Sequence, residues 1–247
     1  QVYSELRILT ARPTAADEAR VPHRLYGILS AAEACSAGRW ADMANVAIDE
    51  TQASGRLAVL VGGTGLYLRA LVEGLNDVPE IPEGVRREAR DMQDRLGPEE
   101  FHAALAELDP AMAVRLNPSD RQRLIRAYEV FAATGRSLAE WQSSGKVASA
   151  PVRAFQTILM QPSREFLYAA CNARVPRMIE AGAIDEVRKL KTMGLDPGLP
   201  AMKALGVAPL FDYLSDKLTL DEAVFATQKK TRNYAKRQVT WFRNQVV

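Results

Sequence analysis

The chain has 247 residues, 47% of them hydrophobic and 25% charged, with a formal net charge of +2. These values fit a globular protein with one large core and room for a smaller domain, and they give no compositional sign of a nucleic-acid binder. Two cysteines and two histidines exclude a disulfide framework and a cysteine- or histidine-rich metal site, and no apolar run is long enough to span a membrane.

The start of the chain is unusual. It begins at Gln1 without a methionine, and Val2-Tyr3 already looks like the middle of a pattern. We therefore expect the natural beginning of the protein, with a first strand and any phosphate loop after it, to lie before Gln1. Residues 21–29 are a candidate edge strand, and hydrophobic spacing predicts a helix over residues 36–52.

The most informative segment is residues 56–67, RLAVLVGGTGLY. The apolar run 57–61 predicts a short strand buried on both faces, as in a parallel sheet. The two glycines that follow permit a sharp turn, and Thr64 is a natural N-cap for a helix over residues 64–75. A helix N-terminus at the carboxyl end of a parallel strand binds anions. Taken alone, the motif is equally compatible with a simple strand-to-helix turn.

The character of the sequence changes at Asn76. The segments 85–96, 98–108 and 121–133 are helical in pattern, and no strand pattern appears until FQTILM at residues 155–160. A polar stretch at residues 143–151 reads as a return linker. The sequence thus predicts an α/β fold, in which a core made of residues 1–75 and 151–247 is interrupted by an all-helical insertion domain, residues 76–150.

Three helical segments carry side chains that suit a phosphate-rich ligand. Residues 121–126, RQRLIR, combine three arginines with Gln122, and Arg174 lies on a helix capped by Ser163. Arginine pairs with phosphates, whereas glutamine suits base edges. The last helix, residues 220–244, sets a basic stripe beside a second stripe of Tyr234, Gln238 and Trp241. Taken alone, solvated helix faces, surface ion pairs and an amphipathic helix closing the core explain these segments at least as well.

Together, these motifs resemble the tRNA dimethylallyltransferases, also called tRNA isopentenyltransferases. The matching elements run in order along essentially the whole chain: QVY at Gln1, TARP at Thr10, VPH at Val21, SAGRW at Ser36, LVGGTGLYLRAL at Leu60, VR at Val85, RQRLIRAYEV at Arg121, the helix with Arg174 and Met178, KALG at Lys203, and RNYAKRQVTWFR at Arg232. A set in this order is far more specific than any single motif.

The resemblance implies a P-loop-type parallel sheet core flanked by helices, with the helical insertion gripping a tRNA anticodon stem-loop. It implies transfer of a dimethylallyl group from dimethylallyl diphosphate to N6 of the adenosine just 3′ of the anticodon, with release of diphosphate and with Mg²⁺ as cofactor. The family's aspartate base and nucleotide-binding loop match no residue here, because only Gln1-Val2-Tyr3 of the aspartate pattern are present. We expect the chain as given to be inactive and the full protein to be active.

The resemblance also assigns residues. Thr64 corresponds to a threonine placed by the reacting adenosine, and Arg174 to an arginine that steadies the diphosphate. Val207 is a weaker match, because an aromatic residue is common there. The positions expected to contact tRNA are Gln1, Arg86, Gln122, Arg123, Leu124, Ile125, Arg126, Lys203, Ala204, Leu205, Gly206, Val207 and Ala208.

Two alternatives remain open at this point. An adenylate isopentenyltransferase, which modifies a free nucleotide, would need neither the helical insertion nor the basic last helix. A non-catalytic RNA-binding fragment would need no phosphate loop. For the family reading we expect a cytoplasmic monomer that binds no membrane.

Overall fold

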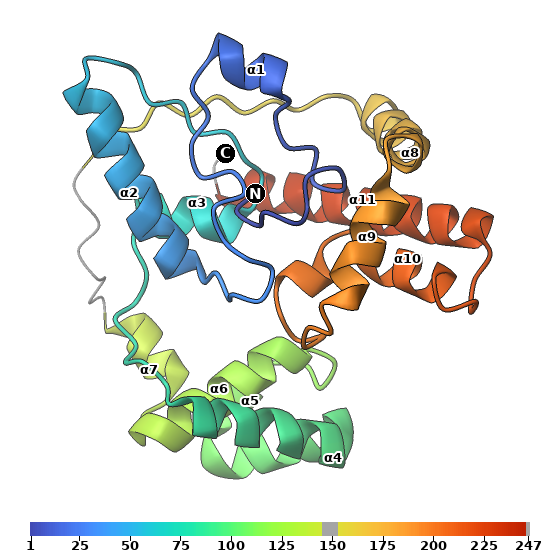
Figure 1. Cartoon of the computed structure of the whole chain (residues 1–247). Coiled ribbons are helices and arrows are strands. Elements are labelled where there is room, and N and C mark those ends of the chain that lie inside the picture. Colours follow the sequence, from blue (N-terminus) through green and yellow to red (C-terminus); the bar gives the residue numbers. More distant parts are fainter. Residues whose placement is uncertain (145–152, 246–247) are drawn as a thin grey trace. The chain divides into compact units, whose positions relative to one another are not determined.

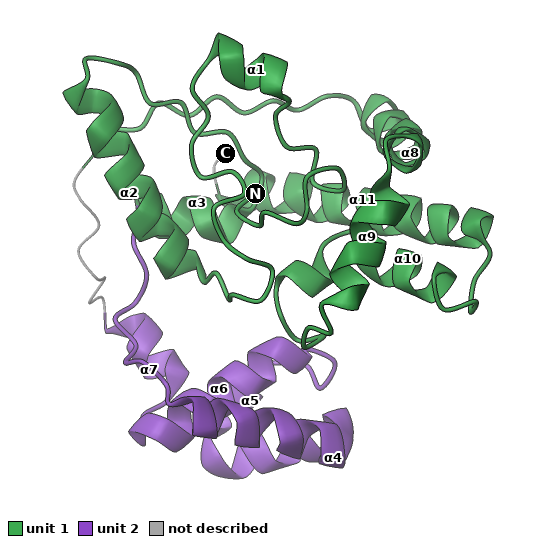
Figure 2. Ribbon diagram, viewed as in Figure 1, with its two compact units in different colours: residues 1–72, 151–247 green, residues 73–150 purple. Residues whose placement is uncertain are grey.

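The computed structural model describes residues 1–144 and 153–245. The chain divides into two compact units, which are coloured separately in Figure 2. Unit 1 comprises Gln1–Val72 and Pro151–Val247, and unit 2 comprises Glu73–Ala150. Most of the linker predicted at 143–151 lies outside the described residues. Among the described helices, none has both the length and the apolar character needed to cross a bilayer.

Unit 1 is built from helices that pack on one another (Figure 1). Its longest helix, α11, contacts α3, α8 and α10, and α3 also contacts α2. The elements are α1 (Ala15–Arg20), α2 (Ala37–Ala53), α3 (Gly65–Val72), α8 (Arg164–Glu180), α9 (Ala183–Thr192), the 3₁₀ turn η1 (Ala201–Lys203), α10 (Val207–Tyr213) and α11 (Leu220–Gln245). The short helices α1 and α10 have no counterpart in the predicted elements.

Side-chain caps explain where two of these helices begin. The Ser36 hydroxyl accepts a hydrogen bond from the Arg39 amide at 3.1 Å and starts α2. The Ser163 hydroxyl accepts one from the Phe166 amide at 3.3 Å and starts α8, as predicted. Each cap satisfies an amide that the first helical turn leaves free.

The predicted parallel sheet is not found in the described residues. Residues 57–61 and 155–160 belong to no strand, and most of their apolar side chains are exposed: Leu57 is 86% and Ile158 84% accessible. A strand buried on both faces needs hydrogen-bonded neighbours and covering layers, and no described segment supplies them. An isolated parallel bridge joins Tyr3 and Leu29.

The core of unit 1 gathers the first residues of the chain onto α9 and α10. Leu6, Val187, Leu190 and Leu210 are at most 1% exposed. A carboxylate fixes this arrangement, because Glu186 accepts hydrogen bonds from three successive amides, those of residues 7, 8 and 9, at 2.6–2.9 Å. Among the described residues these amides donate to no carbonyl of a strand or helix, so the Glu186 carboxylate satisfies them instead.

The described part of unit 2 contains helices joined by loops, and the sequence did not predict two of these helices, at 110–113 and 138–143. Segments 85–96 and 98–108 join into one element that kinks at Gly97, whose φ is 78°, just before Pro98. Pro98 cannot continue the hydrogen-bond ladder of a preceding turn, which explains the break. The helices are α4 (Glu83–Leu108), α5 (Pro110–Ala113), α6 (Arg121–Thr134) and α7 (Leu138–Ser143).

The core of unit 2 contains a fully satisfied buried carboxylate. Phe101, Leu105 and Leu124 are completely buried, and Asp109 is 1% exposed. Asp109 accepts from the Met112 amide at 3.1 Å and from the Ser137 hydroxyl at 2.9 Å, so it caps α5 and joins the start of α7 to it. Burial of a charge is tolerated only with such partners, and this network fixes the path of the loops.

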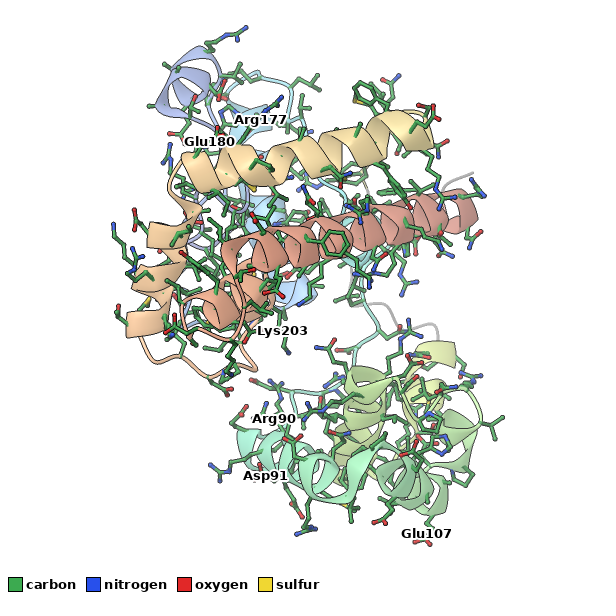
Figure 3. The ribbon with its side chains drawn as sticks, turned by 90° about the vertical axis from the view of Figure 1, so that its right-hand side faces the viewer. Arg90, Asp91, Glu107, Arg177, Glu180 and Lys203 are labelled. Carbon is green, nitrogen blue, oxygen red and sulfur yellow. The ribbon has the colours of Figure 1, made fainter. Side chains whose placement is uncertain are left out.

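Glu186→Gln is expected to destabilise the chain by about 2 kcal/mol, because an amide oxygen replaces a charged acceptor of three backbone N–H groups. Urea unfolding provides the measurement. Glu180→Gln is the matched control, since Glu180 is exposed at the end of α8 (Figure 3) and makes no ion pair among the described residues. Equal midpoints for the two variants would show that Glu186 does not hold the first segment.

Candidate active site and nucleic-acid interface

The GGTG motif lies against one face of α11. Gln238 Nε2 donates to the Gly63 carbonyl at 2.9 Å, and the hydroxyls of Thr64 and Tyr234 lie 3.1 Å apart. The Trp241 ring is so close to Gly65 that a Cβ there would fall 2.2 Å from it. The sequence pattern had placed Tyr234, Gln238 and Trp241 on one stripe, but nothing in it indicated that this stripe meets the glycine loop.

Thr64 does not act as the predicted side-chain cap of α3. Its carbonyl accepts the first helical bonds, from the amides of Tyr67 and Leu68 at 3.0 and 3.2 Å, while its hydroxyl turns to Tyr234. The Thr64 side chain is exposed. The amides at the start of α3 are therefore not blocked by the Thr64 hydroxyl, and the hydroxyl is held beside them.

The opposite side of α3 is anchored to α2 and the segment before it. Tyr67 donates its hydroxyl to the Cys35 carbonyl at 3.0 Å and stacks on Trp40, with ring centroids 5.3 Å apart. Burial, reinforced by the neighbouring Cys35 and Tyr3, raises the pKa of Tyr67 to about 12. Tyr67 therefore stays neutral at physiological pH, and α3 is clamped between α2 and α11.

Arg174 is a cation of unit 1 that could bind an anion. It lies on α8 and donates to the Leu9 carbonyl at 3.2 Å, and among the described residues it pairs with no carboxylate. Burial lowers the pKa of its guanidinium, although arginine remains charged at neutral pH. Arg174 is exposed, and a guanidinium without a carboxylate partner can pair with an anionic ligand.

The segment 203–208 is a turn that leads into α10. Lys203 is exposed at the end of η1 (Figure 3), and Ala208 is also exposed. Gly206 has a φ of 96° and lies against Leu9, and Val207 is completely buried. Lys203 and Ala208 are therefore available to a ligand, whereas Gly206 and Val207 shape the turn. At the start of the chain, Gln1 is exposed, and its carbonyl accepts from the Gly27 amide at 3.0 Å.

In unit 2 the arginines of RQRLIR have different partners. Arg121 bonds to Gln93 and Asp94 of α4, and Arg126 pairs at 2.7 Å with Glu129, which is only 8% exposed. Arg123 has a side chain 76% exposed and only a long 3.9 Å contact, to Asp120. Arg123 is thus the arginine of this helix that is free to meet a phosphate.

The other positions of unit 2 that were expected to contact tRNA also differ in exposure. Gln122 is exposed, Ile125 is half-buried, and Leu124 is completely buried in the core, so Leu124 can only support its neighbours. On α4, Arg86 is half-buried and its Nε has no hydrogen-bond partner. Arg90, one turn on and labelled in Figure 3, is instead paired with Glu83 at 2.5 Å.

The described residues offer no ready metal site. Within residues 1–144 and 153–245, no group of three or more His, Cys, Asp or Glu side chains is placed to hold a metal ion. Both cysteines are free and buried. The structure thus gives an anion-binding arginine and a hydroxyl beside a helix start, without a protein ligand set for a cation.

Comparison with known proteins matches this chain over its whole length. The model of the family described as IPP transferase matches residues 1–245. A tRNA dimethylallyltransferase of Rhodospirillum centenum is 55% identical over 246 residues, which cover 100% of this chain and 78% of that protein.

Solved structures agree with the sequence matches. The crystal structure of a tRNA isopentenylpyrophosphate transferase from Bacillus halodurans is 33% identical, with a TM-score of 0.63, and the match covers 100% of this chain and 76% of that one. A eukaryotic dimethylallyltransferase described as acting on tRNA is 25% identical with a TM-score of 0.77, covering 98% of this chain and 61% of that one. The chain therefore belongs to the IPP transferase family.

Proposed function

We propose that this chain carries out the transfer of a dimethylallyl group from dimethylallyl diphosphate to N6 of the adenosine 3′ of the anticodon in tRNA. In this reaction the C1–O bond of the diphosphate breaks, a C1–N6 bond forms, and N6 loses a proton as diphosphate leaves. Relatives that bear the name tRNA dimethylallyltransferase over the full length of the chain support the proposal. The observation that carries it is Arg174, an exposed residue that donates to the Leu9 carbonyl and pairs with no carboxylate among the described residues.

The roles follow from where negative charge grows. As C1–O breaks, charge accumulates on the diphosphate, and a fixed guanidinium nearby stabilises the transition state more than the ground state. We assign this role to Arg174. We assign Thr64 to the adenosine, because its hydroxyl is exposed beside the uncapped start of α3. No described carboxylate bonds to Thr64 or Tyr234, so no proton acceptor is assigned among the described residues.

A magnesium ion does not fit the described residues as a protein-held cofactor, because they supply no cluster of acidic ligands. Mg²⁺ commonly keeps several waters and binds largely through substrate phosphates. A role for it here would therefore rest on the diphosphate, and no step is routed through it.

We propose that unit 2 binds the anticodon stem-loop through the exposed side of α6. Gln122 and Arg123 supply a base-reading amide and a free cation, and Arg86 on α4 adds a half-buried guanidinium. In unit 1, Gln1 and the turn 203–208 are assigned to the same RNA, with Lys203 as its available cation. RNA loops are read by splaying out bases and bonding their edges, while phosphates position the strand.

The α/β part of the fold prediction also remains a proposal. The exposed apolar side chains of 57–61 and 155–160 support it, because a neighbouring strand would cover them. A monomeric state and a cytoplasmic location are proposed with it; two free cysteines suit a reducing compartment.

Arg174→Ala in the full-length protein is expected to lower the single-turnover rate by roughly 10²–10³-fold, since one charge-assisted contact to the developing charge is lost. Affinity for an anticodon stem-loop should remain unchanged. Arg177→Ala, one turn further along α8, is the control because Arg177 is exposed (Figure 3) and has no assigned role. A wild-type rate for Arg174→Ala would exclude the diphosphate role.

Two variants of α6 can distinguish a residue that reads a base from one that neutralises a phosphate. Arg123→Ala should weaken binding to every stem-loop and reduce the slope of log K against log salt concentration by about one. Gln122→Ala should leave that slope unchanged and reduce discrimination between bases at the modified site. Affinity measured against salt concentration tests both. Identical slopes for the two variants would contradict this division of roles.

Arg126 needs a different design, because its removal leaves Glu129 buried without its partner. We expect Arg126→Ala to destabilise unit 2, and Arg126→Ala with Glu129→Gln to restore much of the lost stability. If Arg126 also contacts a phosphate, the double variant will still show the reduced salt slope. A wild-type slope in the double variant would confine Arg126 to its ion pair.

A further inference from the structure

Three side chains of α11 meet three successive residues of the glycine loop. Gln238 bonds to Gly63, Tyr234 to Thr64, and the Trp241 ring covers Gly65. Positions 234, 238 and 241 are spaced i, i+4 and i+7, so they form one stripe of a helix. We call this stripe the loop-facing stripe of α11. Each of its three side chains contacts a different residue of the loop.

The glycines on either side of Thr64 let the loop approach α11 closely, most strictly at Gly65, where the neighbour is an aromatic ring rather than the end of a flexible side chain. A Cβ at Gly63 would lie 2.2 Å from Gln238 Nε2, and a Cβ at Gly65 would lie 2.2 Å from the Trp241 ring. Neither glycine has a φ in the left-handed region. The absence of a side chain therefore serves close approach to α11 rather than an unusual backbone conformation.

The contact also decides what Thr64 can do. A threonine before a helix ordinarily turns its hydroxyl onto the second or third amide of the first turn, but here the hydroxyl meets the Tyr234 phenol. When the phenol donates, the Thr64 proton is free for an acceptor on a substrate. When Thr64 donates, its lone pairs remain available. In both cases α11 fixes the direction in which the hydroxyl points.

We propose that Tyr234 and Gln238 are positioning residues for Thr64, and that the loop-facing stripe of α11 sets the geometry of the adenosine side of the reaction. The inference rests on the role of Thr64 given under the proposed function. Gln238 holds the backbone just before Thr64, and Tyr234 holds the Thr64 side chain. Neither residue needs to touch the substrate to affect the rate, because a displaced hydroxyl misaligns the reacting groups.

The test is a double-mutant cycle on the full-length protein with an anticodon stem-loop and dimethylallyl diphosphate. Tyr234→Phe removes only the hydroxyl and keeps the ring. It should lower the single-turnover rate by about 3–10-fold, the size expected for one lost hydrogen bond, with unchanged RNA affinity and unchanged thermal midpoint. In a background of Thr64→Val, Tyr234→Phe should have no further effect, because the two residues act as a unit.

Gln238→Glu provides a second measurement. It keeps the shape of the side chain but replaces the donor to the Gly63 carbonyl with an acceptor, so a similar loss of rate at constant RNA affinity is expected. Tyr213→Phe is the control, since Tyr213 on α10 packs beside the core and donates no hydrogen bond from its hydroxyl among the described residues.

The outcomes separate this inference from the proposed function. A Tyr234→Phe rate equal to wild type, or effects of Thr64→Val and Tyr234→Phe that multiply, would overturn the positioning role while leaving Thr64 in place. A Thr64→Val rate equal to wild type would instead remove Thr64 from the proposed mechanism, and the positioning role with it. Slower rates explained wholly by weaker RNA binding would also overturn it, because positioning acts after binding.

Discussion

The hydrogen bond from Gln238 to the Gly63 carbonyl, with the Tyr234–Thr64 contact beside it, ties a loop that has no strand partner to the longest helix of unit 1. Because α11 also packs on α8 and α10, the loop and the helix that carries Arg174 share one support. A helix that contacts the loop and also packs on α8 limits how far these two elements can move relative to each other. Rigidity of this kind is what electrostatic and orientational catalysis require.

Ionic partners, rather than the number of arginines, decide which cations can bind a ligand. Arg121 and Arg126 are engaged with acceptors on α4 and with Glu129, whereas Arg123 stays largely solvated. Arg174 has a carbonyl partner and pairs with no carboxylate in the part of the chain that the structure describes. An arginine already bonded to a buried carboxylate must give up that pairing before it can bind phosphate, and the cost of leaving the carboxylate uncompensated opposes the exchange.

Near the start of the chain, carboxylates accept the backbone amide hydrogen bonds that a neighbouring strand would otherwise accept. Glu186 satisfies three amides of the first segment, and Glu5 accepts from the Ala31 amide at 2.8 Å. Burial opposes ionisation of Glu5, but its hydrogen bonds with Ser4, its own amide and Ala31 keep its pKa below the usual range. Its contribution to stability is therefore present above the ordinary glutamate pKa and fades as the pH falls through the lowered value.

The sequence by itself determined the long helices. Apolar spacing predicted α2 and the cap at Ser163 predicted the start of α8, because both signals act within a few residues of chain. It also determined the family, since ordered motifs are read without knowledge of contacts. The short helices α5, α7 and α10 were missed because pieces of 4–7 residues depend on tertiary packing rather than on their own pattern, whereas α1, also missed, has no buried residue and begins at a local capping box of Thr14 and Asp17.

Only the tertiary structure decided which side chains meet. Strand pairing could not be read from the apolar run at 57–61, since a strand requires a partner that the run does not specify. Thr64 satisfied every local rule for an N-cap and still turned to Tyr234, which lies 170 residues away in the sequence. The distinction between Arg123 and Arg126 likewise depended on the burial of Glu129. Contacts between residues far apart in the sequence are set by how the helices pack. The local sequence pattern around one residue does not specify which distant residue it will contact.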